Sequence, residues 1–268
     1  AYRQTRRAFQ IAYEYQIPSI ILYDQKNGGE LQNVPASVFD EEPNPDLGSV
    51  ITEAELEDAP HDPSGKYNRF QHDVEDNVSP RSIPGQEGGR YLATGNEHMP
   101  AGHIAESPDN RVNQVNRRMS KMETIREALT DDDGERNYHY GPQDAEYGIM
   151  TFGSQQGTAV EAVDRLNAEG ESVKLLGVSE LAPYPVDEVS EFIESVDEVL
   201  VVEMNASAQF RGLTQKELGR FGDRLSSLLK YNGNPFEPGE IVDGFVTSIV
   251  EDGSLPGHET KFVPAAGD

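Results

Sequence analysis

The stretch that decides the fold is residues 147–158, YGIMTFGSQQGT. Its first six residues carry no charge and predict a buried strand over 147–152, and Gly153-Ser154 predicts a tight exit from that strand. After this turn, apolar residues recur at helical spacing over 158–168, which predicts a helix. Gly170 is a typical helix-ending residue. The stretch therefore predicts the first strand and helix of a βαβ unit.

The same alternation continues toward the carboxyl end. Strands that alternate with helices at this spacing imply a parallel, right-handed βαβ sheet, so the sequence predicts an α/β fold. The chain from Gly253 onward is expected to be a frayed tail. The remaining predicted elements are strands over 173–178 and 199–202, a helix over 186–195, a mainly helical segment over 208–229 and a short helix over 239–250.

On the amino side of this unit, a break at 131–134 and a polar linker over 135–144 predict a domain boundary. Before it, residues 110–129 predict a helix with one apolar stripe, and such a stripe is far more often core than a cofactor site. The stripe consists of Val112, Val115, Met119, Met122, Ile125 and Leu129.

Residues 28–110 show little regular spacing of apolar residues. Gly and Pro supply 18 of these 83 residues, and residues 27–65 hold ten acidic side chains without a Lys or Arg. Only 49–59 is weakly helical. A loop region of this length is functional or disordered in most compact domains, and both a solvated insertion and a functional lid or subunit clasp fit the composition.

The amino-terminal segment predicts a helix over 3–15 and a short buried strand over 19–23. A strand of that kind lies in a parallel sheet with neighbours on both sides, and the next ~100 residues offer none. We therefore expect the chain to be a carboxy-terminal piece of a longer polypeptide.

Charge and composition exclude several classes of protein. The 48 Asp and Glu against 22 Lys and Arg give a net charge of -26, which excludes a general nucleic-acid binder, and no apolar run approaches the ~20 residues of a membrane span. The absence of Cys excludes disulfides, thiolate zinc sites, a Cys nucleophile and a Cys-ligated cluster on this chain. No signal peptide is visible, which favours the cytoplasm. An acidic, Lys-poor chain is typical of a salt-saturated cytosol, and an acidic mesophile protein is the alternative.

Two segments carry candidate chemistry. Residues 153–158 join a strand to a helix, a geometry that can hold an anion, although a simple turn is the other interpretation because the segment lacks Lys. In residues 94–103, TGNEHMPAGH, the loop context excludes a helical zinc motif, so we expect loop ordering or the lining of a cleft between subunits or domains, with a solvated surface turn as the alternative. The potential metal ligands there are Glu97, His98, His103 and Glu106, but no metal site is predicted.

Four blocks of this sequence, in order, resemble the carboxy-terminal half of the alpha subunit of 2-oxoacid:ferredoxin oxidoreductases of the 2-oxoglutarate or pyruvate synthase type. Residues 8–24 look like the helix and strand late in that family's pyrimidine-binding domain. The other blocks are 94–98 with 102–104, which look like its TG-x-EH loop, 117–121, which resemble its basic helix, and 153–154, 201–205, Gln209 and 233–236, which resemble its transketolase C-terminal-like domain.

This resemblance implies a fold class and a domain division. Residues 1–130 would be the remnant of a thiamine-pyrimidine-binding-type domain that carries the long acidic insertion, and residues 146–252 a transketolase C-terminal-like parallel-sheet domain. The family's thiamine-contacting residues lie mostly upstream, so no catalytic residue is carried over. The resemblance gives Asn96, Glu97, His98 and His103 as substrate-loop or interface-loop candidates, and Gly153, Ser154, Glu203, Asn205 and Gln209 as domain-interface candidates.

The implied function is a subunit of an enzyme that decarboxylates 2-oxoglutarate or pyruvate to the acyl-CoA and passes the electrons to ferredoxin. Thiamine diphosphate with Mg and a 4Fe-4S cluster would be carried mainly by a beta subunit in a dimer of heterodimers, with coenzyme A as co-substrate. The isolated chain is then expected to be inactive. The alternative is a non-catalytic assembly domain of another thiamine-diphosphate enzyme, of the transketolase or oxoacid dehydrogenase E1 type.

Overall fold

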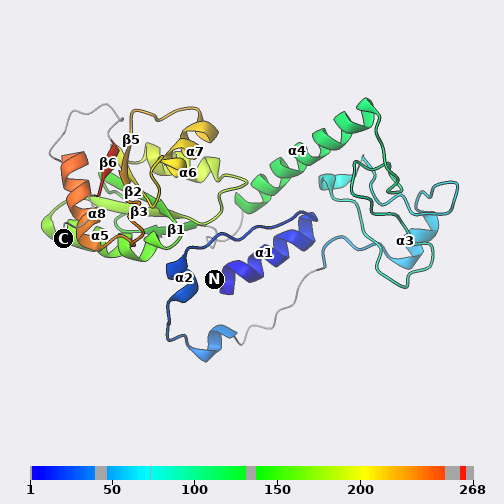
Figure 1. The fold of residues 1–268 in the computed structure, drawn as a ribbon, viewed down its shortest axis with the longest axis horizontal. Coiled ribbons are helices and arrows are strands. Elements are labelled where there is room, and N and C mark those ends of the chain that lie inside the picture. Colours follow the sequence, from blue (N-terminus) through cyan, green and yellow to red (C-terminus); the bar gives the residue numbers. More distant parts are fainter. Residues whose placement is uncertain (1, 40–46, 73, 131–136, 251–259, 264–268) are drawn as a thin grey trace. The chain divides into compact units, whose positions relative to one another are not determined.

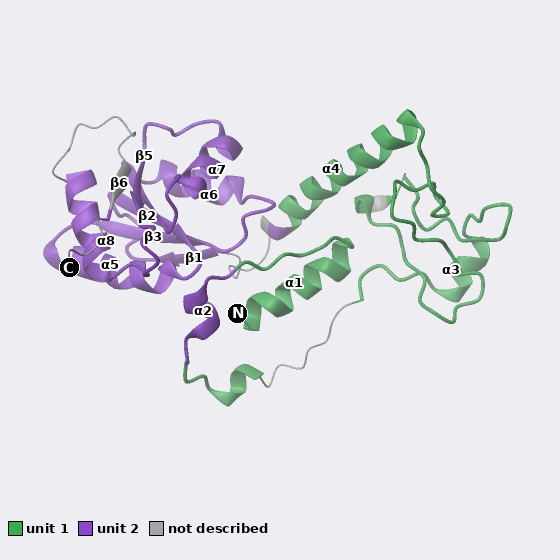
Figure 2. Ribbon diagram, viewed as in Figure 1, with its two compact units in different colours: residues 1–22, 32–128 green, residues 23–31, 129–268 purple. Residues whose placement is uncertain are grey.

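The structure is a computed structural model that describes residues 2–39, 47–72, 74–130, 137–250 and 260–263 (Figure 1). The chain divides into two compact units (Figure 2). The first consists of Ala1–Leu22 and Gln32–Ala128, and the second of Tyr23–Leu31 and Leu129–Asp268.

The second unit contains a mostly parallel sheet. Among the described residues it has six strands in the order β1-β3-β2-β4-β5-β6. Only β1 is antiparallel to its neighbour, and the central strand β2 places Ile149 beside Leu175 and Leu200, all fully buried. The strands are β1 (Asn137–Tyr140), β2 (Tyr147–Phe152), β3 (Val173–Val178), β4 (Glu198–Glu203), β5 (Leu225–Leu229) and β6 (Thr260–Phe262).

Helices cover both faces of this sheet (Figure 1). On one face, Ala162 and Phe245 pack into a cluster with Ile149, and on the other, Phe192 and Phe210 pack beside Met150. The sheet therefore has a buried core on each side, which is why its central strands β2 and β4 are mostly apolar. The helices are α5 (Gln155–Glu169) and α8 (Pro238–Phe245) on the first face, and α6 (Val186–Glu194) and α7 (Gln209–Leu218) on the second; the π-turn η3 (Val246–Val250) extends α8.

The α/β class is confirmed, and the strands predicted over 147–152 and 173–178 have the predicted bounds. The mainly helical segment predicted over 208–229 was wrong in its second half, which forms β5. Ser226 and Ser227 are fully buried there and interrupt the apolar run that identifies a buried strand. The serines are accommodated because Ser226 donates to Glu198 at 2.7 Å and Ser227 accepts from Arg211 at 3.2 Å.

Two edge strands were also missed. Residues 137–140, predicted as part of a polar linker, form β1, whose side chains are polar because it has a neighbour on one side only. Residues 260–262, predicted as part of a frayed tail, form β6 beside β5. The break predicted at 131–134 and the rest of the predicted tail lie outside the described residues.

In the first unit, loops outweigh regular structure. A small cluster of Ile51, Leu56 and Tyr67 is buried within them, and Thr52 and Glu55 form a capping box that begins α3, shorter than the predicted helix over 49–59. No described helix combines the length and the apolar character that a membrane crossing requires. The unit's elements are α1 (Tyr2–Tyr15), η1 (Ala36–Phe39), α3 (Glu53–Asp58), η2 (Glu75–Asn77) and most of α4 (Pro108–Thr130), while α2 (Gln25–Gly29) belongs to the second unit.

The short buried strand predicted over 19–23 was wrong. Residues 19–23 belong to no strand, and Ile20 and Leu22 are 82% and 81% exposed. The apolar composition that predicted burial is present, but none of the six described strands pairs with this segment.

The helix predicted over 110–129 is confirmed as α4, but its apolar stripe is not the core. Val112 and Met119 are 56% and 68% exposed, whereas Gln114 and Lys121 are buried on the other side. Within the stripe, Ile125 and Leu129 alone are buried. The helix is thus rotated relative to the orientation that its hydrophobic pattern predicts. A side that carries Gln114 and Lys121 packs against the rest of the first unit.

Candidate functional site

The loop 94–103 is a closed turn held by its own hydrogen bonds. Its backbone pairs Met99 N with His103 O at 2.7 Å and Gly102 N with Met99 O at 2.8 Å. Gly102 has φ +87°, and a Cβ there would lie 1.8 Å from the Leu92 carbonyl oxygen. Any other residue at 102 would therefore force the loop open.

Within this turn, the ring of His98 has a defined tautomer. Thr94 Oγ1 donates to Gly102 O at 3.1 Å and lies 2.9 Å from His98 Nδ1. Because the single hydroxyl proton is used on Gly102, Nδ1 must be the donor to Thr94. Nε2 is then the ring nitrogen that remains for a hydrogen bond with a ligand.

Contacts from the loops and from α4 fix the position of His98. Its ring stacks on Phe70 with centroids 4.3 Å apart and an interplanar angle of 26°. Its carbonyl oxygen accepts from Asn110 Nδ2 at 3.0 Å and Gln114 Nε2 at 3.1 Å. The imidazole is thereby held at the start of α4.

Glu97 joins the loop to α4 through an arginine pair. Arg118 donates to its two carboxylate oxygens at 3.0 and 2.7 Å, and Arg111 Nε lies 3.9 Å away. The Arg118 hydrogen bonds hold the pKa of Glu97 below its usual value, and the same bonds raise the pKa of Arg118. Glu97 is therefore a carboxylate that orients guanidinium groups.

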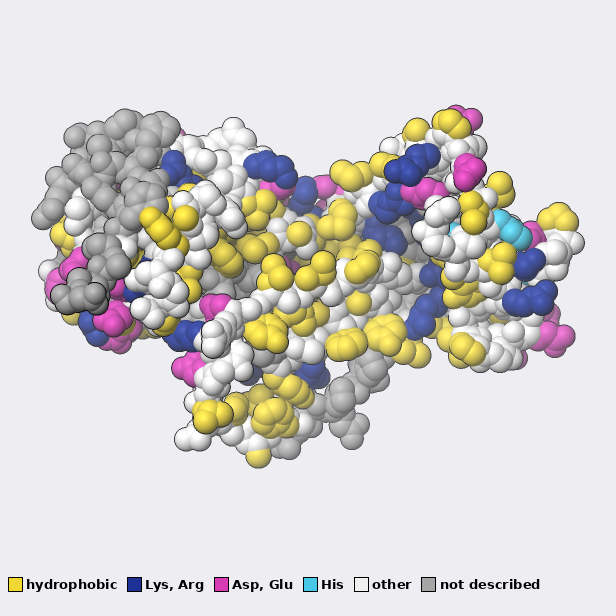
Figure 3. All heavy atoms as spheres, in the orientation of Figure 1, with side chains coloured by type: hydrophobic (Ala, Val, Ile, Leu, Met, Phe, Trp, Pro, Cys, Tyr) yellow, Lys and Arg dark blue, Asp and Glu magenta, His cyan; other side chains and the backbone are white. Residues whose placement is uncertain are grey.

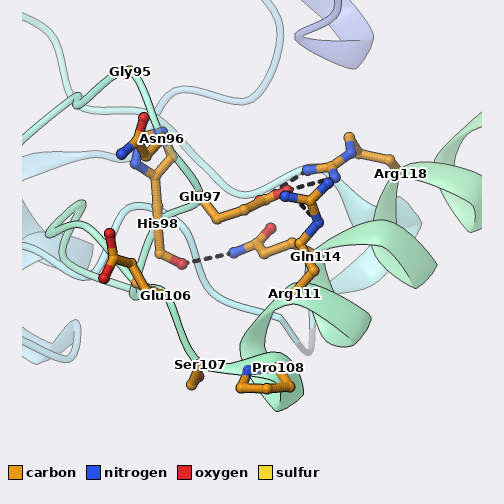
Figure 4. Close-up of a pocket in the computed structure, with 11 residues that line it drawn as sticks. Gly95, Asn96, Glu97, His98, Glu106, Ser107, Pro108, Arg111, Gln114 and Arg118 are labelled. Carbon is orange, nitrogen blue, oxygen red and sulfur yellow. Dashed lines mark hydrogen bonds and ion pairs between the residues drawn. The ribbon is translucent and has the colours of Figure 1, made fainter.

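These side chains line a pocket of about 880 Å³ (Figure 4). In the close-up, the side chains of Glu97, Arg111 and Arg118 converge, and Gln114 reaches toward the His98 carbonyl. Two guanidinium groups, oriented by one carboxylate, give the pocket the means to bind a small anion. The lining residues are Gly95, Asn96, Glu97, His98, Ala105, Glu106, Ser107, Pro108, Arg111, Gln114 and Arg118.

Of the four loop candidates, His103 is not among the pocket's lining residues. Its Nε2 lies 3.0 Å from Asp62 Oδ2, and Asp62 also accepts from the backbone N–H of Ser64 and Lys66. The Lys66 hydrogen bond is the main reason that the pKa of Asp62 is lowered. His103 therefore connects the 94–103 loop to the loop that contains Asp62, which is the loop-ordering role named among the alternatives above.

The five domain-interface candidates gather where β2 and β4 end, and those strands are neighbours in the sheet. Glu203 is fully buried and accepts from Asn205 Nδ2 at 2.6 Å, Phe210 N at 2.7 Å and Arg211 N at 3.2 Å. Asn205 Oδ1 in turn accepts from Gln209 N at 3.2 Å. These three candidates form one network that satisfies the amino-terminal amides of α7.

Gly153 and Ser154 make the turn between β2 and α5, as predicted. Gly153 has φ +69°, and the Ser154 hydroxyl donates to the carboxylate of Asp24. Ser154 makes no side-chain cap to α5. The contact joins this turn to the segment just before α2, within the second unit.

Sequence reasoning did not assign Arg111 and Arg118 to the site. Together with Gln114 they occur at i, i+3 and i+7 on α4, a spacing that places all three on one side of the helix. That spacing is a signal in the sequence, but the stronger apolar stripe on the same helix masked it.

The side chains of the described residues limit which metal ions or clusters this part of the chain can ligate. They contain no group of three or more His, Asp or Glu side chains that could hold a metal ion. The chain has no Cys to ligate an iron–sulfur cluster. The donor groups of these residues therefore do not fit a Cys-ligated iron–sulfur cluster or a metal site built from three or more such side chains.

Residues 145–239 match the family model of the pyruvate:ferredoxin oxidoreductase core domain II. Among curated proteins, the chain is 27% identical over 254 residues to the alpha subunit of 2-oxoacid:ferredoxin oxidoreductase 1 of Sulfurisphaera tokodaii, and 31% identical over 262 residues to that of Aeropyrum pernix. Each alignment covers 94% of this chain and 37% of the relative. The chain thus spans somewhat over a third of the length of these relatives.

A solved structure is also similar. The 2-oxoglutarate:ferredoxin oxidoreductase from Magnetococcus marinus, determined with 2-oxoglutarate, coenzyme A and succinyl-CoA bound, matches with a TM-score of 0.60 and 30% identity over 70% of this chain and 32% of its own. Together with the family match, this likeness confirms the predicted transketolase C-terminal-like sheet domain.

Proposed function

We propose that this chain is the carboxy-terminal portion of the alpha subunit of a 2-oxoacid:ferredoxin oxidoreductase. The observation that carries the proposal is the similarity to curated alpha subunits along 94% of the chain, through both units. The solved relative supports it as well, since that enzyme was determined with a 2-oxoacid, coenzyme A and an acyl-CoA bound.

The proposed reaction is oxidative decarboxylation of 2-oxoglutarate or pyruvate to the acyl-CoA, with electrons passing to ferredoxin. Thiamine diphosphate with Mg, which supplies the carbanion chemistry, and the 4Fe-4S cluster would be carried mainly by a beta subunit in a dimer of heterodimers, and the absence of Cys from this chain supports this for the cluster. The enzyme would be cytoplasmic, and the chain would be inactive alone.

Within that enzyme, the proposed role of the 94–118 pocket is to bind the oxoacid or to close on it at a subunit or domain interface. Arg111 and Arg118 are suited to a carboxylate, because a guanidinium presents a planar fork of N–H donors. Their orientation by Glu97, and the free Nε2 edge of His98, support this role. The residues 153–154 and 203–209 are proposed to lie at a domain interface.

The acidic surface supports the further proposal of a halophilic source. The chain carries a net charge of -26 and only seven Lys. High salt shortens the screening length and relieves the repulsion among such charges.

Co-expression tests the subunit assignment. The coding region that contains this chain, tagged at the carboxyl end, is expressed with the neighbouring open reading frames and purified. We expect a beta subunit to co-purify with it, and a Tyr-Pro-Ile-Thr-Pro-type segment to be encoded upstream. A partner of transketolase type, or of oxoacid dehydrogenase type, would instead support a non-catalytic assembly domain.

A further inference from the structure

Three cationic side chains meet in the first unit, apart from the pocket described above. Arg117 and Lys121 lie one helical turn apart on the polar side of α4, and Arg69 comes from the loops. Arg69 is 8% exposed and Lys121 is 9% exposed. None of the three lines the 94–118 pocket, to which the adjacent residue Arg118 contributes.

Neutral acceptors hold the two guanidinium groups in place. Arg69 Nη1 donates to Ser79 O at 2.8 Å, and its Nη2 donates to the Gln16 side-chain oxygen. Arg117 donates to Ser79 Oγ at 2.7 Å and to Asn77 O at 3.3 Å. These bonds orient the guanidinium groups but leave their positive charge uncompensated.

No hydrogen bond or ion pair joins the Lys121 side chain to the described residues, although its Nζ is not one of the fully buried atoms that lack a partner. Its pKa is lowered to about 8, mainly by burial and in addition by the nearby charges of Arg117 and Arg69. Partial desolvation of an ammonium is costly, and two neighbouring cations add repulsion to that cost.

The chain as a whole does not lack carboxylates, since it has 48 acidic residues against 22 Lys and Arg. In Figure 3, Lys and Arg side chains nevertheless gather over α4 and the loops beside it. No carboxylate contributes to the pKa of Arg69, Arg117 or Lys121 among the causes that dominate each shift. A site that concentrates cations in so acidic a protein is suited to an anion from outside the chain.

We propose that Arg69, Arg117 and Lys121 bind a phosphate group, either free or carried as a phosphomonoester. A phosphate near neutral pH carries more than one negative charge, so it compensates three cations better than a single carboxylate does. Guanidinium groups match its oxygens with paired N–H donors, and the lysine adds a point charge. The nine-tenths burial of two of the three cations suits a small, desolvated anion.

The test is thermal unfolding of the full 268-residue chain, titrated with potassium phosphate, with AMP and with potassium chloride at constant ionic strength. We expect a saturable rise in melting temperature with phosphate or AMP, and no such rise with chloride. Response to phosphate alone identifies the free ion as the source, and response to AMP identifies the ester.

Two variants and a matched control complete the test. Lys121→Met removes the buried charge, so it should melt higher than the wild type in phosphate-free buffer and lose the response to phosphate. Arg117→Gln should weaken phosphate binding by at least tenfold in isothermal titration calorimetry. Arg165→Gln, the same loss of charge on the exposed surface of α5, should bind phosphate like the wild type.

The proposal is overturned by any of three results. These are the absence of a saturable response to phosphate and AMP, an equal response to chloride, or an unchanged response in both Lys121→Met and Arg117→Gln. The co-purification of a beta subunit does not depend on these outcomes, so this inference and the proposed function fail separately.

Discussion

Arg118 donates to both carboxylate oxygens of Glu97, at 3.0 and 2.7 Å, and thereby joins the 94–103 loop to the middle of α4. The pair forms one wall of the pocket, and the same loop holds His98 on the adjoining wall. The position of the loop therefore depends on this contact together with the hydrogen bonds to the His98 carbonyl.

Arg118→Gln should loosen the loop while leaving the fold intact. The Arg118 side chain is 56% exposed, so the loss of the pair should lower the free energy of unfolding by only about 1 kcal/mol or less. Hydrogen exchange of the backbone amides in residues 94–103 should become faster. Arg126→Gln, which removes a partner of Glu123 within the same helix, is the control and should leave that exchange unchanged. Equal exchange in Arg118→Gln and wild type would contradict the role of the pair.

His98→Ala should impair the assembled enzyme without disassembling it. The substitution removes an imidazole that stacks on Phe70 and contacts Thr94 in a loop that lines the pocket, so we expect a several-fold lower kcat or a several-fold higher KM for the oxoacid. His139→Ala is the matched control, because the His139 ring contacts Glu188 in the second unit. Unchanged kinetics of the His98→Ala complex would identify the loop as a surface turn.

Much of the sheet could be predicted from sequence because its central strands are buried on both faces. Residues 147–152 and 173–178 form mostly apolar runs whose side chains are nearly all buried, and such runs predict a central strand. β5 could not be predicted, because Ser226 and Ser227 are buried by virtue of partners that only the tertiary structure supplies. Edge strands such as β1 have one neighbour, so their composition resembles that of a linker.

The candidate site was predictable in part. The loop residues Asn96, Glu97 and His98 stand together in the sequence and line one pocket. The side of α4 that the first unit buries was not predictable, because the apolar stripe on which periodicity depends is largely exposed in this chain. Residues 20–23 show the same effect, since their apolar side chains also remain exposed.

The buried Lys121 should give the chain a pH-dependent stability. Its folded pKa, about 8, lies below its ordinary value of 10.5. Between those values the unfolded chain binds more protons than the folded chain, so the free energy of unfolding rises with pH across this window, by up to about 3 kcal/mol. Urea denaturation in phosphate-free buffer should show the rise in wild type and not in Lys121→Met. Parallel pH profiles of the two proteins would contradict it.

Salt should stabilise the chain. The net charge of -26 creates repulsion that the folded state concentrates, and molar salt shortens the Debye length from about 10 Å to about 3 Å. We therefore expect the melting temperature to rise between low and molar potassium chloride. A flat or falling melting temperature would contradict the proposed halophilic source, but not the proposed subunit assignment.

The most direct test of the proposed function is the activity of the assembled enzyme. The complete alpha subunit that contains this chain is purified with its beta subunit, and reduction of a viologen dye is followed with 2-oxoglutarate or pyruvate. We predict reduction that requires both an oxoacid and coenzyme A, and none from the isolated 268-residue chain. A complex loaded with thiamine diphosphate and its cluster that reduces the dye with neither oxoacid, or an isolated chain that reduces it, would contradict the proposal.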